Sequence, residues 1–280
     1  MTTAQDGILV YKLNAAGVPL SAILELPKGL AARSTILAIH GRGMRAAYWN
    51  SFIPLATGLG HAVLAVDRPG YGDSAHRLPE GQTLADQAET LQAALKEHAC
   101  GHDIGAGVLL LGHSDGGKVA FHTAAAEGGV RLLGLDVSGV GYRYHPQALR
   151  LPSTLGGGAI GLNWGPLRLY PHGTFRASRA LLSPTPPRES AETVHWPAQY
   201  EALAPNVRVP VRLTFAEHEA WWRLDDPTLT SMTSRLASSP RVTVEHLPAA
   251  GHNISLGRTA TAYHLRVLTF LEDCLLAARS

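Results

Sequence analysis

The chain lacks a hydrophobic run long enough to span a membrane, and its N-terminus lacks a basic stretch followed by an apolar one. A membrane-spanning helix needs about 18 apolar residues, so we expect no transmembrane helix. Without a signal peptide we expect a cytoplasmic protein. Cysteine is also scarce: Cys100 and Cys274 lie far apart and show no metal-ligand spacing. This scarcity favours a reducing compartment, allows one disulfide at most, and predicts no metal site.

A strong excess of charge of either sign is missing as well. The formal net charge is +2, which argues against the basic surface that a nucleic-acid partner would need. In contrast, hydrophobic residues make up 45% of the 280 residues, enough for a large core. The length is typical of one α/β domain.

Short apolar runs alternate with stretches of helical periodicity. The runs predict eight strands, at residues 7–13, 19–26, 34–40, 61–67, 107–111, 132–137, 211–216 and 242–247. The first two are expected to form a hairpin, and helices are expected at 83–98 and 259–278. Strands that are apolar along their whole length are typical of a parallel sheet buried on both faces. The sequence therefore predicts an α/β fold with a mostly parallel central sheet flanked by helices.

Residues 142–207 break this alternation. They would separate the sixth and seventh strands and divide the core into residues 1–141 and 208–280. The stretch is rich in glycine, proline and aromatic residues and is too long for a simple loop. We expect this 142–207 insertion to cover the C-terminal edge of the sheet as a lid. Residues 141–200 carry six arginines against two glutamates, which would suit an acidic substrate, a phosphate-bearing thioester or an acidic carrier protein, or simply a solvated face.

Residues 112–116 have the pattern G-x-S-x-G, with Ser114 at its centre. The apolar run 108–111 precedes it, and a helical stretch, 118–126, follows. A strand that turns sharply into a helix around a serine lifts the hydroxyl out of the sheet toward a substrate. The pattern therefore predicts Ser114 as a nucleophile.

Three further motifs occur in a fixed order around this serine. They are His40-Gly41 after the third expected strand, the run from Asp67 to Ser74 after the fourth, and Gly251-His252 after the last. With Ser114 they resemble the "HG", "D-x-P-G-x-G-x-S", elbow and "GH" motifs of the α/β-hydrolase superfamily, and the match covers nearly the whole chain. The resemblance implies an α/β-hydrolase fold and a serine esterase or thioesterase with a lid insertion. The loop 67–74 is expected to shape a turn and not to take part in catalysis.

The resemblance also implies partners for the serine. His252 is the expected base, because it follows a strand late in the chain and adjoins a glycine that permits a tight turn. The acid in this family usually follows the preceding strand, and there Glu219 takes the place of the usual aspartate. Glu217, Asp136 and the pair Asp225 and Asp226 stay open as alternatives.

An oxyanion hole needs two backbone N–H donors. One is expected from Asp115, which follows the nucleophile, and the other from Arg42 or, less favourably, Gly43. A carboxylate near a developing oxyanion is unhelpful, so the Asp115 side chain is expected to turn toward Lys118 or another basic group. The Arg42 side chain would either reach an anionic substrate group or lie in solvent.

Large aromatic residues occur near these motifs and in the insertion. They suggest a pocket lined by Tyr48, Trp49, Trp164, Trp196, Trp221 and Trp222, although ring packing between insertion and core explains any one of them equally well.

The sequence thus predicts a cofactor-free serine hydrolase that cleaves an ester or thioester through an acyl-enzyme on Ser114. Its expected partner is a small-molecule acyl substrate. The basic insertion leaves open that this substrate is anionic or attached to a carrier. The alternatives are an acyltransferase or thioesterase acting on carrier-bound acyl groups, a C–C or amide bond hydrolase, and a non-catalytic binding protein on the same fold.

Overall fold

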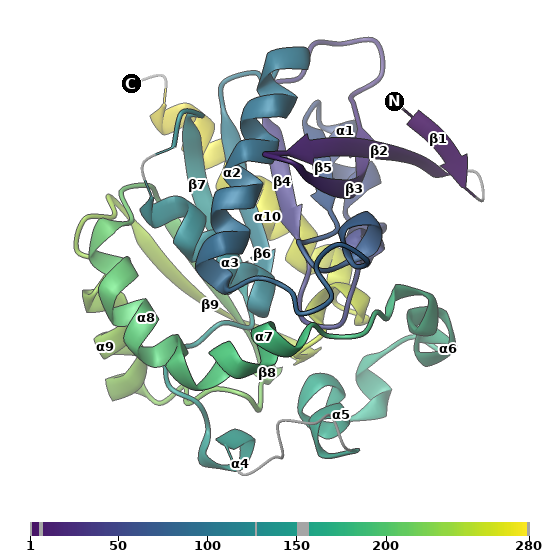
Figure 1. The fold of residues 1–280 in the computed structure, drawn as a ribbon. Coiled ribbons are helices and arrows are strands. Elements are labelled where there is room, and N and C mark those ends of the chain that lie inside the picture. Colours follow the sequence, from purple (N-terminus) through teal and green to yellow (C-terminus); the bar gives the residue numbers. More distant parts are fainter. Residues whose placement is uncertain (1, 6–7, 127, 150–156, 279–280) are drawn as a thin grey trace.

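A single sheet forms the centre of the molecule (Figure 1). The computed structural model describes residues 2–5, 8–126, 128–149 and 157–278. Within them nine strands lie in the order β1-β2-β3-β5-β4-β6-β7-β8-β9. The strands are β1 (Thr2–Gln5), β2 (Ile8–Ala15), β3 (Val18–Glu25), β4 (Thr35–Ile39), β5 (Ala62–Val66), β6 (Val108–His113), β7 (Leu132–Ser138), β8 (Val211–His218) and β9 (Val242–Gly251).

Strands β5, β4, β6, β7, β8 and β9 run parallel to one another. Strands β1, β2 and β3 join the β5 edge in antiparallel pairs. The mostly parallel sheet and the β2–β3 hairpin were predicted. Strand β1 was not predicted, because its sequence Thr-Thr-Ala-Gln has no apolar pattern; its pairing with β2 defines it as a strand.

The pleat of the sheet divides the buried side chains between two cores. In β4, Leu37 and Ile39 point into one core, and Ile36 and Ala38 point into the other. The first core includes side chains of α2 (Leu84–Gly101) and α3 (Asp115–Ala125), and the second includes those of α1 (Ile53–Gly58) and α10 (Ala260–Ala277). Because successive strand residues face opposite sides, a wholly apolar strand is buried on both faces, as a sheet between two helical layers requires.

Short helices complete the chain. The α-helices are α4 (Pro146–Leu149), α5 (Gly157–Trp164), α6 (Thr174–Ser178), α7 (Pro187–Ala191), α8 (Trp196–Leu203) and α9 (Asp226–Ser234). The 3-10 helices are η1 (Ala46–Trp49), η2 (Gly72–Ser74), η3 (Leu167–Leu169), η4 (Arg179–Leu181), η5 (Glu192–His195), η6 (Ala204–Asn206) and η7 (Ile254–Leu256). No helix among the described residues is both long and apolar enough to cross a membrane. Cys100 and Cys274 are both free thiols.

The 142–207 insertion connects β7 to β8 and holds the helices from α4 to η6. Figure 1 shows α5, α6 and α7 beyond the end of the sheet where β8 finishes. Helix α8 lies against α3 through Trp196 and Tyr200, both fully buried in the first core. The insertion therefore shares the core of the sheet. Residues 150–156, which include the predicted basic residue Arg150, lie outside the described residues.

Candidate active site

The turn between β6 and α3 places Ser114 at the edge of the sheet. Ser114 has φ 52° and ψ −125°, a left-handed conformation that is rare for a residue with a side chain and typical of functional turns. Glycines on either side allow the close approach that this turn needs. A Cβ on Gly112 would lie 2.5 Å from Gly117 Cα, and one on Gly116 would collide with the His40 carbonyl oxygen.

His252 lies directly against this serine. It follows β9, and its Nε2 is 3.0 Å from Ser114 Oγ. Only 3% of its side chain is exposed, so the imidazole is held in place by packing. The distance is within hydrogen-bonding range, as a base that removes the serine proton requires.

Glu219 completes the row of three side chains. It follows β8, and its Oε2 lies 2.8 Å from His252 Nδ1. Its carboxylate is fully buried, and Oε1 also accepts a hydrogen bond from the Trp221 backbone N–H at 3.1 Å. The structure therefore brings together the three residues that the sequence singled out.

The alternative acids lie elsewhere. Glu217 is exposed and accepts a hydrogen bond from Ala249 N. Asp136 is buried inside the sheet in an ion pair with Arg212 at 2.7 Å. Asp225 caps the N-terminus of α9, and Asp226, the first residue of that helix, is exposed.

A second histidine supports His252 from behind. His113 is buried, its ring centre lies 4.9 Å from that of His252, and it stacks on Tyr48. Its Nδ1 lies 3.0 Å from Ser138 Oγ. Burial, with the charge of a protonated His252, lowers the pKa of His113 well below its ordinary value. His113 is therefore a neutral packing partner for the imidazole.

The backbone N–H groups of the oxyanion-hole candidates differ in whether they already donate a hydrogen bond. The Gly43 N–H donates to the Tyr71 hydroxyl at 3.1 Å, so it is already engaged. The backbone N–H groups of Arg42 and Asp115 have no protein acceptor among the described residues. This difference favours Arg42 over Gly43 as the second donor beside Asp115.

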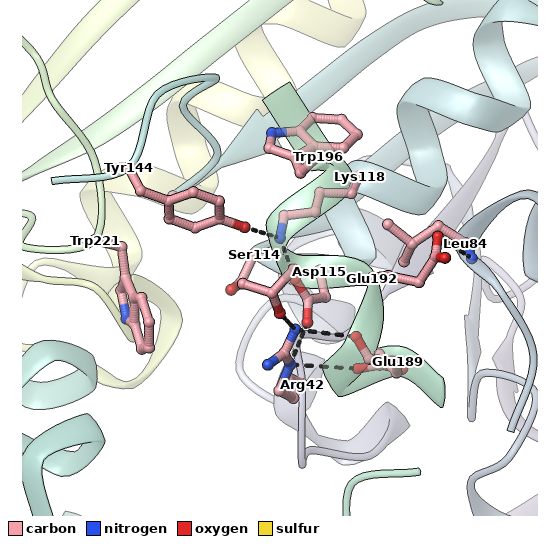
Figure 2. A network of polar contacts seen from close by, with 12 residues as sticks. Arg42, Leu84, Ser114, Asp115, Lys118, Tyr144, Glu189, Glu192, Trp196 and Trp221 are labelled. Carbon is pink, nitrogen blue, oxygen red and sulfur yellow. Dashed lines mark hydrogen bonds and ion pairs between the residues drawn. The ribbon is translucent and has the colours of Figure 1, made fainter. Parts of the chain in front are cut away.

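The Asp115 side chain turns toward two cations, as predicted. Lys118 Nζ lies 2.7 Å from Oδ1, and Arg42 Nε lies 2.5 Å from Oδ2 (Figure 2). Burial opposes ionisation of this carboxyl, but the attraction of Arg42 and Lys118 outweighs it and lowers the pKa of Asp115. The aspartate therefore stays charged and paired beside the nucleophile.

Arg42 also reaches the insertion. Its Nη2 donates to Thr193 Oγ1 at 2.7 Å and to the Glu189 carbonyl oxygen at 3.3 Å. The fully buried carboxylate of Glu189 accepts from both terminal nitrogens of Arg68, at 2.8 and 2.9 Å, and from the Tyr71 hydroxyl at 2.9 Å. The same tyrosine binds Gly43, so the insertion is bonded to the loop that contains the oxyanion-hole candidates.

A model of the Alpha/beta hydrolase family matches residues 36–262, a span that includes Ser114, Glu219 and His252. The chain belongs to the alpha/beta hydrolase family. A putative aryl esterase from Burkholderia cenocepacia shares this hydrolase fold with a TM-score of 0.74 at 19% identity, over 95% of this chain and 99% of that one. A carboxyl esterase from Bacillus coagulans gives 0.70 at 17% identity, over 96% and 98%.

Two curated relatives match over shorter stretches of this alpha/beta hydrolase. An esterase of Mycobacterium tuberculosis, Rv0045c, is 37% identical over 90 residues, which are 32% of this chain and 28% of the relative. A putative carbamate hydrolase, RutD of Cronobacter sakazakii, is 36% identical over 91 residues, 32% of each chain. The matched stretch therefore spans about a third of the length of these relatives.

The aromatic pocket candidates of this hydrolase fall into two groups. Tyr48, Trp49 and Trp196 are fully buried in the cores, where ring packing accounts for them. Trp221 is partly exposed, and its ring centre lies 6.3 Å from that of His252. Trp164 packs against Tyr170 and Phe175 within the insertion, and Trp222 stacks on Tyr144. Among these six described residues, Trp221 alone combines a ring contact with His252 and an accessible surface.

The loop from Asp67 to Ser74 is structural, as expected. Asp67 accepts hydrogen bonds from Ser21 Oγ and the Ala46 N–H, both at 2.7 Å, and pairs with Arg45. Gly72 has φ 54°, and a Cβ there would collide with the Ser21 hydroxyl. The loop thus joins β3, β5 and the start of η1.

Sequence reasoning missed the buried polar residues around the nucleophile. Glu189, Arg68, Tyr71 and Tyr144 were not among the candidates. Nothing in the local pattern marks Glu189, which lies in a proline-rich stretch. One signal was available: Glu189 is one of only three carboxylates in the sequence of the 142–207 insertion, which is strongly basic.

Proposed function

We propose that this protein is a cofactor-free serine hydrolase that cleaves an ester or thioester through an acyl-enzyme on Ser114. The observation that carries the proposal is the continuous row Ser114 Oγ, His252 and Glu219, with separations of 3.0 and 2.8 Å. A serine hydroxyl is a poor nucleophile alone, and this arrangement supplies a base together with a group that orients it. The ester- and carbamate-cleaving names of the relatives support acyl chemistry.

In the first half-reaction Ser114 Oγ attacks the carbonyl carbon while His252 Nε2 takes the hydroxyl proton. Glu219 accepts the hydrogen bond from Nδ1–H, which holds the required tautomer and stabilises the imidazolium. The negative oxygen of the tetrahedral intermediate accepts from the N–H groups of Arg42 and Asp115. His252 then donates its proton to the departing alcohol or thiol, and the acyl group stays on Ser114.

In the second half-reaction water replaces the leaving group. His252 removes a proton from the water, whose oxygen attacks the acyl carbon. The intermediate collapses, the carboxylic acid departs and Ser114 regains its proton from His252. The 142–207 insertion acts as a lid, since it is bonded to the Arg42 loop and contacts Trp221 through Asn163, whose Oδ1 accepts from the indole N–H at 2.9 Å.

A fluorophosphonate probe followed by peptide mass spectrometry tests the scheme. Ser114 should carry the adduct, and Ser114→Ala should abolish both labelling and hydrolysis of p-nitrophenyl esters. Ser238→Ala, at an exposed serine, is the matched control and should retain both. Full ester hydrolysis by Ser114→Ala would refute the scheme.

A second candidate is a thioesterase or acyltransferase for acyl groups on an acidic carrier. The observation in its favour is that the described insertion arginines Arg143, Arg168, Arg176, Arg179 and Arg188 are all exposed. Acyl-carrier thioesters should then turn over faster than the corresponding simple thioesters, and added salt should reduce that advantage.

A further inference from the structure

Tyr144 has a hydroxyl that accepts a hydrogen bond but donates none within the described part of the chain. Lys118 Nζ donates to this oxygen at 2.8 Å, so the phenol must direct its own hydrogen elsewhere. No acceptor for it occurs among the described residues. Burial raises the pKa of Tyr144 despite the nearby lysine, so the phenol keeps its proton. Tyr144 is therefore an unfilled hydrogen-bond donor that an ammonium group polarises.

The position of this donor is fixed beside the nucleophile. Lys118 binds both Tyr144 and Asp115, and Asp115 directly follows Ser114. The Tyr144 ring stacks on Trp222 with ring centres 4.3 Å apart, and the two residues also form a backbone bridge. The hydroxyl is thus connected through Lys118 to Asp115, next to the nucleophile, and the stacked ring has little freedom to move.

Arg42 supplies a second unfilled donor on the other side of Ser114. Its Nε and Nη2 are bonded to Asp115 and Thr193, whereas Nη1 has no acceptor among the described residues. About a quarter of the side chain, 24%, is exposed, so an incoming group can reach it. In Figure 2 Trp221 lies across from Ser114. In this view Tyr144 lies above the serine and Arg42 lies below it.

The charges around these donors are unequal. Among the described residues, Arg42, Arg68 and Lys118 form ion pairs with two carboxylates, Asp115 and Glu189, which leaves one positive charge in excess within this cluster. The Glu219 carboxylate is hydrogen-bonded to His252 and forms no ion pair with these three cations among the described residues. An uncompensated charge in a largely buried place is costly, and a bound anion relieves that cost.

We infer that the substrate carries a carboxylate, separate from the bond that is cleaved, and that this carboxylate binds between the Tyr144 hydroxyl and the Arg42 guanidinium. Guanidinium and carboxylate form charge-assisted hydrogen bonds, and a phenol donor fits the second oxygen. The substrate class is therefore the half-ester or half-thioester of a dicarboxylic acid, or an ester whose alcohol part is an acid. The inference rests on the proposed function, because it assumes that Ser114 performs the cleavage.

Matched pairs of substrates test it. One series contains p-nitrophenyl half-esters of succinate, glutarate and adipate, each compared with the ester in which the free carboxylate is a primary amide. A second series contains butyrate esters of hydroxy acids with their amides. At least one acid should exceed its amide by about tenfold or more in kcat/KM, and the ratio should fall in concentrated salt.

Tyr144→Phe should lower that ratio severalfold, because it removes one donor and preserves the ring. Tyr142→Phe is the control and should leave both rates unchanged, since its hydroxyl donates to Ser231 outside the site. Equal turnover of acids and amides in both series, or an unchanged ratio in Tyr144→Phe, would overturn the inference and leave the labelling of Ser114 intact. Absence of labelling and of turnover would overturn the proposed function, and the inference with it.

Discussion

Replacing Glu189 with glutamine should lower the free energy of unfolding by about 3 kcal/mol. The Glu189 carboxylate is fully buried and is the main counter-charge of Arg68, whose side chain is also fully buried. The amide keeps the shape of the side chain but removes its charge. Arg68 would keep its hydrogen bonds to the His40 carbonyl oxygen and to Gln87, which limits the loss.

That magnitude follows from the burial. Breaking a buried ion pair from one side costs about 3–5 kcal/mol, because the other charge stays in a poorly solvated place. The two neutral hydrogen bonds that Arg68 retains put Glu189→Gln at the lower end. For a chain of this size about 3 kcal/mol corresponds to a fall in Tm of about 6 °C or more.

The measurement is thermal unfolding by circular dichroism, with Glu192→Gln as the matched control. Glu192 lies three residues further along, is partly exposed and accepts a hydrogen bond from a glutamine side chain, so its change should shift Tm by about 1–2 °C at most. Glu189→Gln should also reduce kcat more than it raises KM, since Glu189 contacts Tyr71 and Arg42 beside the oxyanion-hole loop. If the Tm of Glu189→Gln lay within 1–2 °C of the wild-type value, the conclusion that Glu189 is needed to stabilise the buried charge of Arg68 would be refuted.

Three further changes have expected results. Glu219→Gln should reduce kcat/KM for esters by about a hundredfold or more, whereas Glu217→Gln, which alters an exposed carboxylate two residues away, should not; similar losses in both would contradict the assigned acid. Burial lowers the pKa of His98 to about 4, so the unfolded chain binds more protons below about pH 6.5, and stability to urea should fall on acidification from pH 7 to 4. His98→Leu should reduce that fall by about 2–3 kcal/mol, and an unchanged slope would exclude His98 as its source. Gly72→Ala should destabilise the fold by about 2 kcal/mol or more, because a side chain there is strained and meets a serine hydroxyl, whereas Gly58→Ala meets no neighbour and should be neutral or stabilising in urea melts.

The three residues of the candidate triad were predictable because each follows a strand with a clear apolar pattern. Ser114, Glu219 and His252 come after β6, β8 and β9, three parallel strands. Parallel strands end at the same edge of a sheet, so residues far apart in sequence meet there. Local patterns and the family resemblance therefore pointed to Ser114 and His252 and made Glu219 the first of several candidate acids, and the parallel topology brought the three together.

The buried charges were not predictable in this way. Glu189 and Arg68 are 121 positions apart, and each lies in a segment that reads as a polar loop. A charged residue is usually exposed, so composition alone assigns both to the surface. Only the path of the insertion across the sheet edge makes them partners. The same reasoning explains Trp49 and Trp196, which the sequence marked as pocket candidates and which the fold packs into its two cores.

Arg42 connects the predicted active-site residues with the 142–207 insertion. Its backbone N–H is an oxyanion-hole candidate, while its side chain is bonded to Asp115 on α3 and to Thr193 in the insertion. The position of the N–H therefore depends on contacts that come from the insertion as well as from the sheet. A relative that keeps the serine, histidine and glutamate but replaces the insertion would need another partner for this guanidinium. Of the two residues that hold this guanidinium, Asp115 belongs to a motif that the sequence identified, whereas Thr193 belongs to the part of the chain that sequence patterns describe least well.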